Sequence, residues 1–407
     1  MTIQSKQETV SAEELIRRAR DLVPFLRERA DQVEKDRMVL KENIEALREA
    51  GLFKITQPAQ WGGYEMDLEV FCQVLMEIGS GCPSTAWVLG VLGVHAWEIP
   101  RLGVRAGNDV WGENPDALIA SSYSPFGTAT KTEGGWILNG QWRSSSGCDH
   151  SDWAFIGAYQ YDDEGKVVDH LSFLVPRTDY TIVDDWYTFG LQGTGSKSLV
   201  LDNVFVPDYR SHSMIEDKGL NLNDLPPLYR MNQNFVFFTS VSAAVVGFAQ
   251  GAIDLYIEHM KSRINYKHAG SGVKRAAQSP YVKDRLGNAV LKVRSSRLRV
   301  LNAARVATEY AKRGEKTPIR EAVQLLLDTT SVGKECSEAV ILLHRAQSAR
   351  GVYSSSPLQR VLRDILAAAN HGTQNSDDTA GLLGGYLLGE SIPPMIFNLE
   401  GYPPEAE

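Results

Sequence analysis

The chain of 407 residues holds 42 basic and 50 acidic side chains, so its net charge at pH 7 is −8, and 43% of its residues are hydrophobic. This length and composition are typical of a globular protein with two or three domains, and the acidic balance argues against nucleic acid or an anionic membrane as a partner. The four cysteines form no CxxC pair and are expected to be reduced thiols. Because neither a secretory signal nor a run of about 18 apolar residues is found, we expect a cytoplasmic protein without a membrane-spanning helix.

Apolar residues recur at helical spacing towards both ends of the chain, whereas the middle carries short β-rich runs bounded by Gly, Asn, Asp and Pro. The expected helices lie, in chain order, within 12–50, at 68–79, 84–99, 240–266, 280–313 and 319–348. The β-rich runs fall between about 117 and 215 and predict an antiparallel barrel or sandwich. The long amphipathic helices that follow predict a bundle.

The order of these elements predicts an α+β chain that is mostly α-helical and has three domains. We expect an N-terminal helical domain at 1–115, a middle β-domain at 116–222 and a C-terminal four-helix-bundle domain at 223–407. The segment 216–231, rich in Asp, Asn, Leu and Pro, is the expected connection between the last two.

The most specific segment of the chain runs from Phe189 to Pro207 and reads FGLQGTGSKSLVLDNVFVP. This pattern resembles the middle β-domain of the acyl-CoA dehydrogenase fold, in which a Gly-Thr-Gly-Ser turn reaches a flavin. The resemblance covers essentially the whole chain and predicts that fold for it. It also implies that Thr194 and Ser196 contact a flavin.

A second segment, Asn139–Trp153 (NGQWRSSSGCDHSDW), resembles the family's Asn-Gly-x-Lys-x-Trp-Ile-Thr-Asn. In the family the Thr lies beside flavin N5 and the Trp covers a ring face; here Ser146 and Ser144 hold these positions. The Ser-Ser-Gly form is similar to the oxygenase components of two-component flavin monooxygenases. A hydroxyl near N5, in a site that excludes water, should slow the loss of peroxide from an oxygen adduct at flavin C4a, and Ser146 is our candidate. The alternative is a polar loop at a strand end.

The third segment is Arg363-Asp364 followed by Asn370-His371-Gly-Thr-Gln, which resembles the dehydrogenases' Arg-Asp followed by Tyr-Glu-Gly-Thr. His371 therefore stands where the dehydrogenases carry their catalytic Glu, and the alternative base position is Phe237. Without a carboxylate, acyl-CoA dehydrogenation is disfavoured, whereas a histidine can take a proton from a phenol. We predict that His371 is this base, with a structural residue at a helix end as the alternative.

His95 lies in a nearly all-apolar stretch, which predicts either a buried core histidine or a group that faces an apolar pocket. In the monooxygenase branch a similarly placed histidine contacts the substrate, so we expect His95 to assist His371. Aromatic residues nearby, Trp97 and Trp111, are expected to line the same substrate pocket.

The resemblance implies further flavin contacts outside these segments. Ser122 and Tyr123 are expected to line the flavin groove. Arg263 and Tyr266 resemble the family's Arg-x-x-Phe, in which the arginine meets the flavin phosphate, a role suited to its bidentate donors.

These features together identify the chain as resembling the oxygenase component of a two-component flavin monooxygenase. It is most similar to the oxygenases that act on the phenolic secosteroid of bacterial steroid breakdown and on 4-hydroxyphenylacetate. The resemblance implies reduced FMN or FAD (FMN slightly favoured), O2, a C4a-hydroperoxyflavin, a small phenolic or other electron-rich aromatic substrate, no metal, and a homotetramer. It also implies an NAD(P)H-dependent flavin reductase as partner, and no GxGxxG opens a βαβ unit in this chain.

Two other functions remain open at this point. One is a flavin dehydrogenase or oxidase of the acyl-CoA dehydrogenase type. The other is a non-catalytic flavin-binding homologue.

Overall fold

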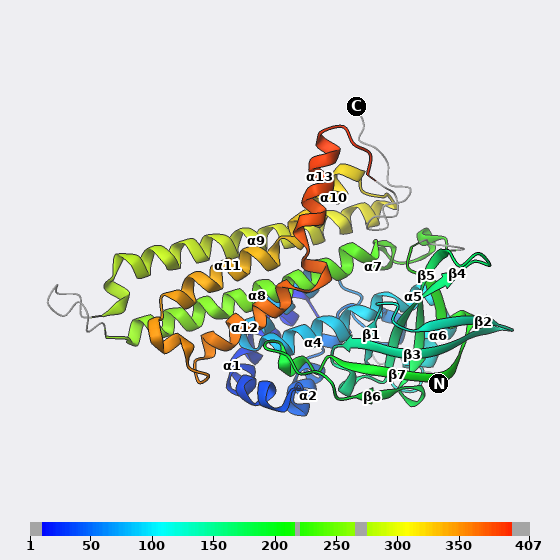
Figure 1. The fold of residues 1–407 in the computed structure, drawn as a ribbon, viewed down its shortest axis with the longest axis horizontal. Helices are drawn as coiled ribbons and strands as arrows, with labels where there is room; N and C mark the ends of the chain where they lie inside the picture. The colour runs from blue at the N-terminus through cyan, green and yellow to red at the C-terminus, as the bar shows by residue number, and fades with distance from the viewer. Residues whose placement is uncertain (1–9, 216–219, 265–274, 393–407) are drawn as a thin grey trace.

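The computed structural model describes residues 10–215, 220–264 and 275–392, and helices and strands separate along the chain (Figure 1). The N-terminal helices are α1 (Ala12–Asp36), α2 (Lys41–Glu49), α3 (Leu68–Gly81), α4 (Pro83–Val94), α5 (Ile99–Leu102) and α6 (Val104–Trp111). The strands are β1 (Ile119–Ser122), β2 (Thr128–Thr132), β3 (Gly135–Ser145), β4 (Trp153–Tyr161), β5 (Val167–Pro176), β6 (Thr181–Val183), β7 (Lys197–Pro207) and β8 (Ser211–Ser213). The later helices are α7 (Pro227–Arg230), α8 (Gln233–Ser262), α9 (Pro280–Arg313), α10 (Ile319–Thr330), α11 (Val332–Arg345), α12 (Pro357–Ala369) and α13 (Ser376–Leu387).

The N-terminal helices begin and end where local chemistry requires it. Ser11 caps α1 by accepting a hydrogen bond from the Glu14 amide at 3.2 Å, and Arg37 ends the helix in a left-handed conformation with φ of 53°. Pro83 occupies the first turn of α4, where its missing N–H costs nothing. This start places α4 between the β-region and the helical bundle (Figure 1).

The β-region consists of two four-stranded sheets, with strand orders β1-β4-β5-β8 and β2-β3-β7-β6. All pairs are antiparallel except β1 and β4, in which Ile119 lies opposite Trp153 in a parallel register. The predicted sandwich is confirmed, but its description as wholly antiparallel was wrong at β1. The chain leaves β1, forms β2 and β3 in the other sheet and then returns to β4, and such a crossover permits a parallel pair.

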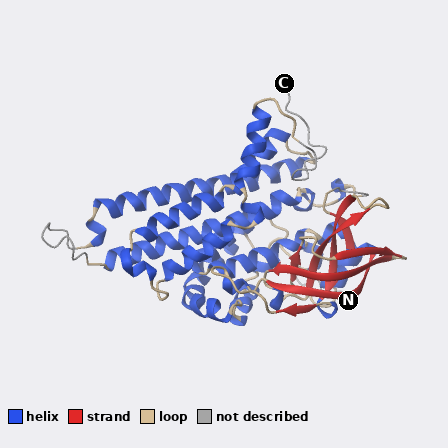
Figure 2. Cartoon of the chain, in the orientation of Figure 1, coloured by secondary structure: helices blue, strands red, loops and turns tan. Residues whose placement is uncertain are grey.

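The C-terminal helices form a bundle around α8, which packs against α3, α9, α11 and α12 (Figures 1 and 2). Helix α8 begins seven residues before the predicted start at 240. The predicted helix 319–348 is broken, since α10 ends at Thr330 and α11 begins at Val332. At the break the Gly333 amide donates to the Gln374 side chain at 2.8 Å, so a long-range contact replaces local helix pairing.

Helix α8 is long and apolar enough to cross a membrane, although the sequence analysis found no such run. However, 78% of its most apolar window is buried inside the protein. This burial is typical of a core helix, and the small residues Gly247 and Gly251 allow its backbone to approach α3 closely.

Candidate active site

Three buried hydroxyl groups meet where the end of β3 faces the turn before β7. The Ser146 and Ser196 oxygens lie 2.7 Å apart, and Ser196 lies 2.7 Å from the Thr194 hydroxyl. Thr194 in turn donates to the Leu191 carbonyl at 2.8 Å, and the Gly147 amide donates to the Thr194 carbonyl at 2.9 Å. The two segments singled out in the sequence are thus one hydrogen-bonded unit, here called the hydroxyl cluster (Ser146, Thr194 and Ser196).

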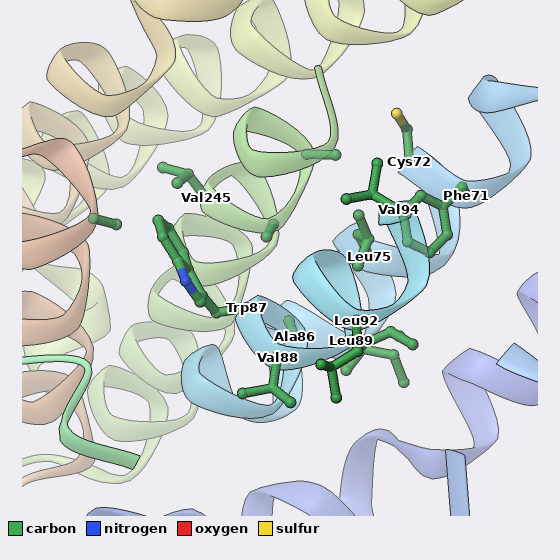
Figure 3. Close-up of a cluster of buried hydrophobic side chains, with 14 of the residues drawn as sticks. Phe71, Cys72, Leu75, Ala86, Trp87, Val88, Leu89, Leu92, Val94 and Val245 are labelled. Atoms are coloured by element: carbon green, nitrogen blue, oxygen red, sulfur yellow. The ribbon is translucent and has the colours of Figure 1, made fainter. Parts of the chain in front are cut away.

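Trp87 of α4 joins the hydroxyl cluster to His371. Its indole N–H donates to the Ser146 hydroxyl at 3.1 Å, and its ring meets the His371 ring edge to face at 5.2 Å between centroids. Figure 3 shows the Trp87 side chain extending from α4 towards α8, near Val245. Sequence reasoning missed Trp87, although its spacing of eight residues from His95 was a usable signal.

One face of α4 runs from Trp87 to His95. Residues 87, 91 and 95 are spaced at i, i+4 and i+8, so they share a helix face about 12 Å long. Val91 is the one α4 residue that is not buried. This face therefore extends from the hydroxyl cluster at one end to His95 at the other.

His95 is 1% exposed and belongs to a buried polar network. Its Nδ1 atom lies 3.0 Å from the Tyr123 hydroxyl, which donates a short hydrogen bond to Glu98. Glu98 also accepts from His212 at 2.9 Å and from Ser172 at 3.1 Å. Sequence reasoning missed Glu98 and His212, which lie 114 residues apart.

An aromatic wall closes the other side of His95. The Phe237 ring, on α8, lies 5.2 Å from His95, 5.7 Å from Tyr123 and 6.0 Å from Trp97 between centroids. A phenylalanine at this position supplies apolar surface where some acyl-CoA dehydrogenases carry their base. The arrangement suits a small aromatic ring and offers no carboxylate to it.

The hydrogen bonds of His95 fix its tautomer. Tyr123 has one hydroxyl hydrogen and donates it to Glu98, so His95 Nδ1 must carry the hydrogen that joins it to Tyr123. The Nε2 atom of His95 is then an acceptor, and it is buried without a hydrogen-bond partner among the described residues. Burial lowers the pKa of His95 to about 4, with the charge of Glu98 opposing, so the ring is neutral at pH 7.

His371 has the opposite tautomer. It caps the short helical turn Gly372–Gln374, and its Nδ1 accepts from the Thr373 amide at 3.3 Å, with the Thr373 hydroxyl at 2.9 Å. In the neutral ring Nε2 must therefore carry the hydrogen. His371 is exposed in the single chain, yet the surrounding protein desolvates it enough to lower its pKa to about 4. In these neutral tautomers His371 presents a donor at Nε2 and His95 presents an acceptor at Nε2. The role of His371 as the base stays a prediction.

Helix α12 holds the turn of the hydroxyl cluster in place. The buried Asp364 carboxylate accepts from the Leu191 amide at 2.7 Å. A Cβ on Gly190 would lie 2.0 Å from the Arg363 carbonyl, so only glycine permits this approach. The Arg-Asp motif therefore positions the Gly190–Ser196 segment relative to His371.

Four predicted residues have side chains engaged elsewhere. The Ser122 hydroxyl donates to the Arg143 carbonyl at 2.6 Å, and Tyr123 is part of the Glu98 network, so neither hydroxyl hydrogen is directed to a flavin. The Trp97 indole donates to the Leu228 carbonyl at 2.9 Å, and its ring edge reaches Phe237. The Trp111 indole donates to the Ala117 carbonyl at 3.1 Å within a separate hydrophobic cluster, so this placement lends no support to substrate contact.

The remaining flavin predictions concern Ser144, Arg263 and Tyr266. Ser144 is exposed with φ of 63°, a conformation that turns the chain towards Ser146. Arg263 donates to the Ala346 and Gln347 carbonyls, each at 3.3 Å. Tyr266 lies outside the described residues. The flavin contacts of all three stay predictions.

A cavity of about 550 Å³ lies beside the Glu98 network rather than at the hydroxyl cluster. It is bounded by Arg101, His212, Phe235, Tyr310 and Lys316, and none of the predicted site residues lines it. Its link to the site is His212, which also contacts Glu98.

Comparison with known proteins identifies the family. The N-terminal-domain model of the acyl-CoA dehydrogenases matches residues 9–110, and the C-terminal-domain model matches residues 239–376. The oxygenase subunit HsaA of a flavin-dependent monooxygenase from Rhodococcus jostii is 36% identical over 88% of this chain and 93% of its own length. The chain belongs to the oxygenase components of the flavin-dependent monooxygenases.

Other relatives and solved structures agree with this family. The oxygenase is 31% identical to the oxygenase component of p-hydroxyphenylacetate 3-hydroxylase from Acinetobacter baumannii over 95% of this chain and 92% of that protein. It is also 31% identical to the FADH2-dependent resorcinol hydroxylase oxygenase of a Rhizobium species, over 92% and 94%. The crystal structure of 3-HSA hydroxylase from Rhodococcus sp. RHA1 superposes with a TM-score of 0.88 at 33% identity, over 94% of this chain and 98% of that one. XiaF from a Streptomyces species, solved with FADH2 and glycerol, gives 0.87 at 29% identity, over 94% and 97%.

These findings confirm the predicted fold and the predicted enzyme class. The oxygenase depends on a flavin, and membership of this family implies a separate flavin reductase. No group of three or more histidine, cysteine, aspartate or glutamate side chains that could hold a metal occurs in the described part of the chain.

Proposed function

We propose that the oxygenase uses reduced flavin and O2 to hydroxylate a small phenol between the hydroxyl cluster and His95. The observation that carries this proposal is the pairing of a buried hydroxyl cluster with two neutral histidines of opposite tautomer. A thioester dehydrogenase needs a carboxylate base, and His371 and Phe237 occupy the two positions where the fold carries one. No observation favours the dehydrogenase or the non-catalytic alternative.

The hydroxyl cluster fits the polar edge of a flavin. Bound reduced flavin supplies the electrons that activate O2. Thr194 donates to the Leu191 carbonyl, and Ser196 can donate to Thr194, so both hydrogens have partners within the protein. Ser146 accepts a hydrogen bond from the Trp87 indole. Its own hydroxyl hydrogen can turn from Ser196 to a ligand nitrogen while the other hydrogen bonds of the cluster stay in place. Ser146 is therefore the hydroxyl best placed to serve the flavin.

The two histidines divide the work on the substrate. His95 Nε2 accepts the phenol hydrogen, which makes the ring a better donor of electrons to the incoming oxygen. His371 Nε2–H donates a hydrogen bond and holds an oxygen atom near the hydroxyl cluster. Phe237 and the α4 face supply apolar surface beside His95.

The activities for which two relatives are named support a phenolic substrate. One acts on p-hydroxyphenylacetate and another on resorcinol, and both are phenols. For the flavin we now favour FAD over FMN, because the resorcinol enzyme is named as FADH2-dependent and XiaF was solved with FADH2. A cytoplasmic location, a homotetramer and an NAD(P)H-dependent reductase that delivers reduced flavin remain part of the proposal.

The test is an anaerobic mixture of the protein with chemically reduced FAD, or FMN, followed by a pulse of oxygenated buffer in a stopped-flow instrument. A lag before the oxidised-flavin spectrum returns, together with hydroxylated product from resorcinol or p-hydroxyphenylacetate, supports the proposal. Return without a lag and without product from either phenol would reject it. The flavin that gives the longer lag identifies the preferred cofactor.

A further inference from the structure

The buried hydrogen-bond network around Glu98 extends beyond His95, the one member that would contact the substrate. It contains an acid, a phenol and two imidazoles, and it runs from His95 in the proposed site to His212, which is 9% exposed and borders the 550 Å³ cavity. Glu98 itself is fully buried. Burial of four ionisable groups carries a desolvation cost in folding free energy. Their arrangement in one hydrogen-bonded row therefore suggests a function.

The contact between the Glu98 carboxyl and His212 Nε2 requires a proton on one of the two groups. His212 Nδ1 lies 2.8 Å from the Ser213 carbonyl and must donate to it, while Nε2 faces the Glu98 carboxyl at 2.9 Å. Either His212 is doubly protonated and Glu98 is ionised, or His212 is neutral and Glu98 carries the proton. Burial acts to raise the pKa of Glu98, but the hydrogen bond and charge of His212, aided by His95 and Tyr123, hold it below its ordinary value. The ionised form of Glu98 is thus the resting form.

We propose that His95, Tyr123, Glu98 and His212 form a proton relay that carries the phenol proton from the site to the cavity, with Glu98 as its central carrier. The relay rests on the proposed function, because that function supplies the phenol. Glu98 touches neither substrate nor flavin and acts through His95, so it is a positioning residue.

Each transfer in the relay balances. The phenol O–H bond breaks as an N–H bond forms at His95 Nε2. The His95 Nδ1–H bond breaks as Tyr123 gains a hydrogen, and Tyr123 passes its original hydrogen to Glu98. The His212 imidazolium then loses its Nδ1 proton to water in the cavity and keeps the Nε2–H that faces Glu98. The pair ends as a neutral carboxyl and a neutral imidazole, so one proton has left the phenol and one has reached water. No electron changes hands, and a phenolate remains in the site.

The charges that face Glu98 come from several elements. His95 and Tyr123 approach it from one side, Ser172 of β5 and His212 of β8 from the other, and the positive charge of Arg101 on α5 acts on it electrostatically. Arg101 also borders the cavity. The positive charges of His212 and Arg101 therefore stabilise the ionised form of Glu98, which can accept a proton.

The first test needs no ligand. Neutron diffraction from crystals of the whole protein should find a hydrogen on His95 Nδ1 and none on Nε2, with two nitrogen-bound hydrogens on His212. Glu98→Gln should remove the second hydrogen from His212. A hydrogen on His95 Nε2 in the wild type would overturn the relay, whatever the result of the flavin experiment.

The second test uses 4-nitrophenol, whose phenolate is coloured, with the flavin-free protein at a pH below the probe's own pKa. The wild type should bind the probe as phenolate and release a proton to a dye in solution. Glu98→Gln and Tyr123→Phe should each lower the bound phenolate-to-phenol ratio about tenfold, equivalent to one pKa unit. His170→Gln is the matched control, because His170 lies 2.9 Å from the Tyr123 carbonyl and is outside the relay.

The outcomes separate the relay from the proposed function. If both variants ionise the probe as the wild type does, the relay is rejected. If one variant fails to fold, the other decides, and the neutron result decides if the probe does not bind. If the wild type shows no delay before oxidised flavin returns and forms no product, the proposed function is rejected. The relay is then still tested by the neutron diffraction and by the ionisation of the bound probe.

Discussion

Trp87 and His371 meet edge to face with 5.2 Å between their ring centroids, and the same indole donates its N–H to Ser146. One side chain of α4 therefore determines how far the C-terminal histidine lies from the hydroxyl cluster. The two residues are 284 positions apart in the chain (371 minus 87), so the contact depends on the docking of α12 and its following turn against α4.

Replacing Ser146 with alanine should shorten the lag before oxidised flavin returns. One hydrogen bond of about 0.5–1.5 kcal/mol is lost, so the lag should shorten by roughly two- to tenfold. Stopped-flow absorbance after an oxygen pulse measures it. Ser151→Ala is the matched control, because that buried hydroxyl bonds to the Cys148 carbonyl outside the cluster. An unchanged lag in Ser146→Ala would show that another group serves the flavin.

Replacing His371 with asparagine should slow hydroxylation but leave the delay before oxidised flavin returns unchanged. Asparagine can still cap the Gly372–Gln374 turn, so the fold should hold. Loss of the Nε2–H donor should lower the rate of product formation by about 10²-fold. Rapid quench of a single turnover with resorcinol measures it. His344→Asn, at another helix end where His344 bonds to the Gly351 carbonyl, should leave the rate unchanged. Wild-type rates in His371→Asn would exclude the donor role.

Stability should fall with acid in a way that depends on His95. The pKa of His95 is lowered by burial from 6.5 to about 4, so the unfolded chain binds a proton that the folded chain rejects. Above about pH 6.5 His95 is neutral in both states and does not lower the free energy of unfolding. As the pH falls towards 4, protonation of the unfolded chain lowers the free energy of unfolding by at most about 3 kcal/mol. Urea midpoints at pH 5 and 7.5 should differ more in the wild type than in His95→Gln. Equal differences would mean that His95 titrates normally.

Asp364 should affect the pH dependence of stability in the opposite direction to His95. Burial raises its pKa from 3.8 to about 6, so the folded chain holds the proton more tightly and stability falls as pH rises from about 4 through about 6. Asp364→Asn keeps an oxygen for the Leu191 amide without the charge, and its melting temperature should exceed that of the wild type at pH 7.5 but not at pH 4. Asp364→Ala lacks the acceptor and should melt lower at both. A lower melting temperature of Asp364→Asn at pH 7.5 would show that the charge is needed.

Much of the fold could be predicted because its signals are local. Helical spacing, the strand runs and the Gly-Thr-Gly-Ser turn are each defined by residues close together in the chain. The structure contains these elements, except that the helix predicted at 84–99 ends at Val94 and the helix predicted at 319–348 is broken. The break at Ser331 could not be predicted, because its cause is the side chain of Gln374 bonding to the Gly333 amide. The parallel β1–β4 pair likewise depends on a crossover through the second sheet.

The candidate site was predictable only in part. Ser146, Thr194 and Ser196 were found because a family motif marks them, and the structure brings them together. The roles of the two histidines depend on their hydrogen-bond partners, which lie on other elements in the case of His95. Glu98 looked like an ordinary helix residue, and His212 like a strand residue, because nothing in a linear sequence links them.

The α4 face carries one further consequence. Trp87 lies on α4, and His95 begins the short helical turn that follows α4 directly. The distance between these two side chains is therefore set by a continuous helical stretch and does not change with the substrate. The opposite wall is different, since Phe237 projects from another helix, α8, and faces His95 with its ring. Attempts to broaden the range of phenols should therefore vary position 237 and leave α4 untouched.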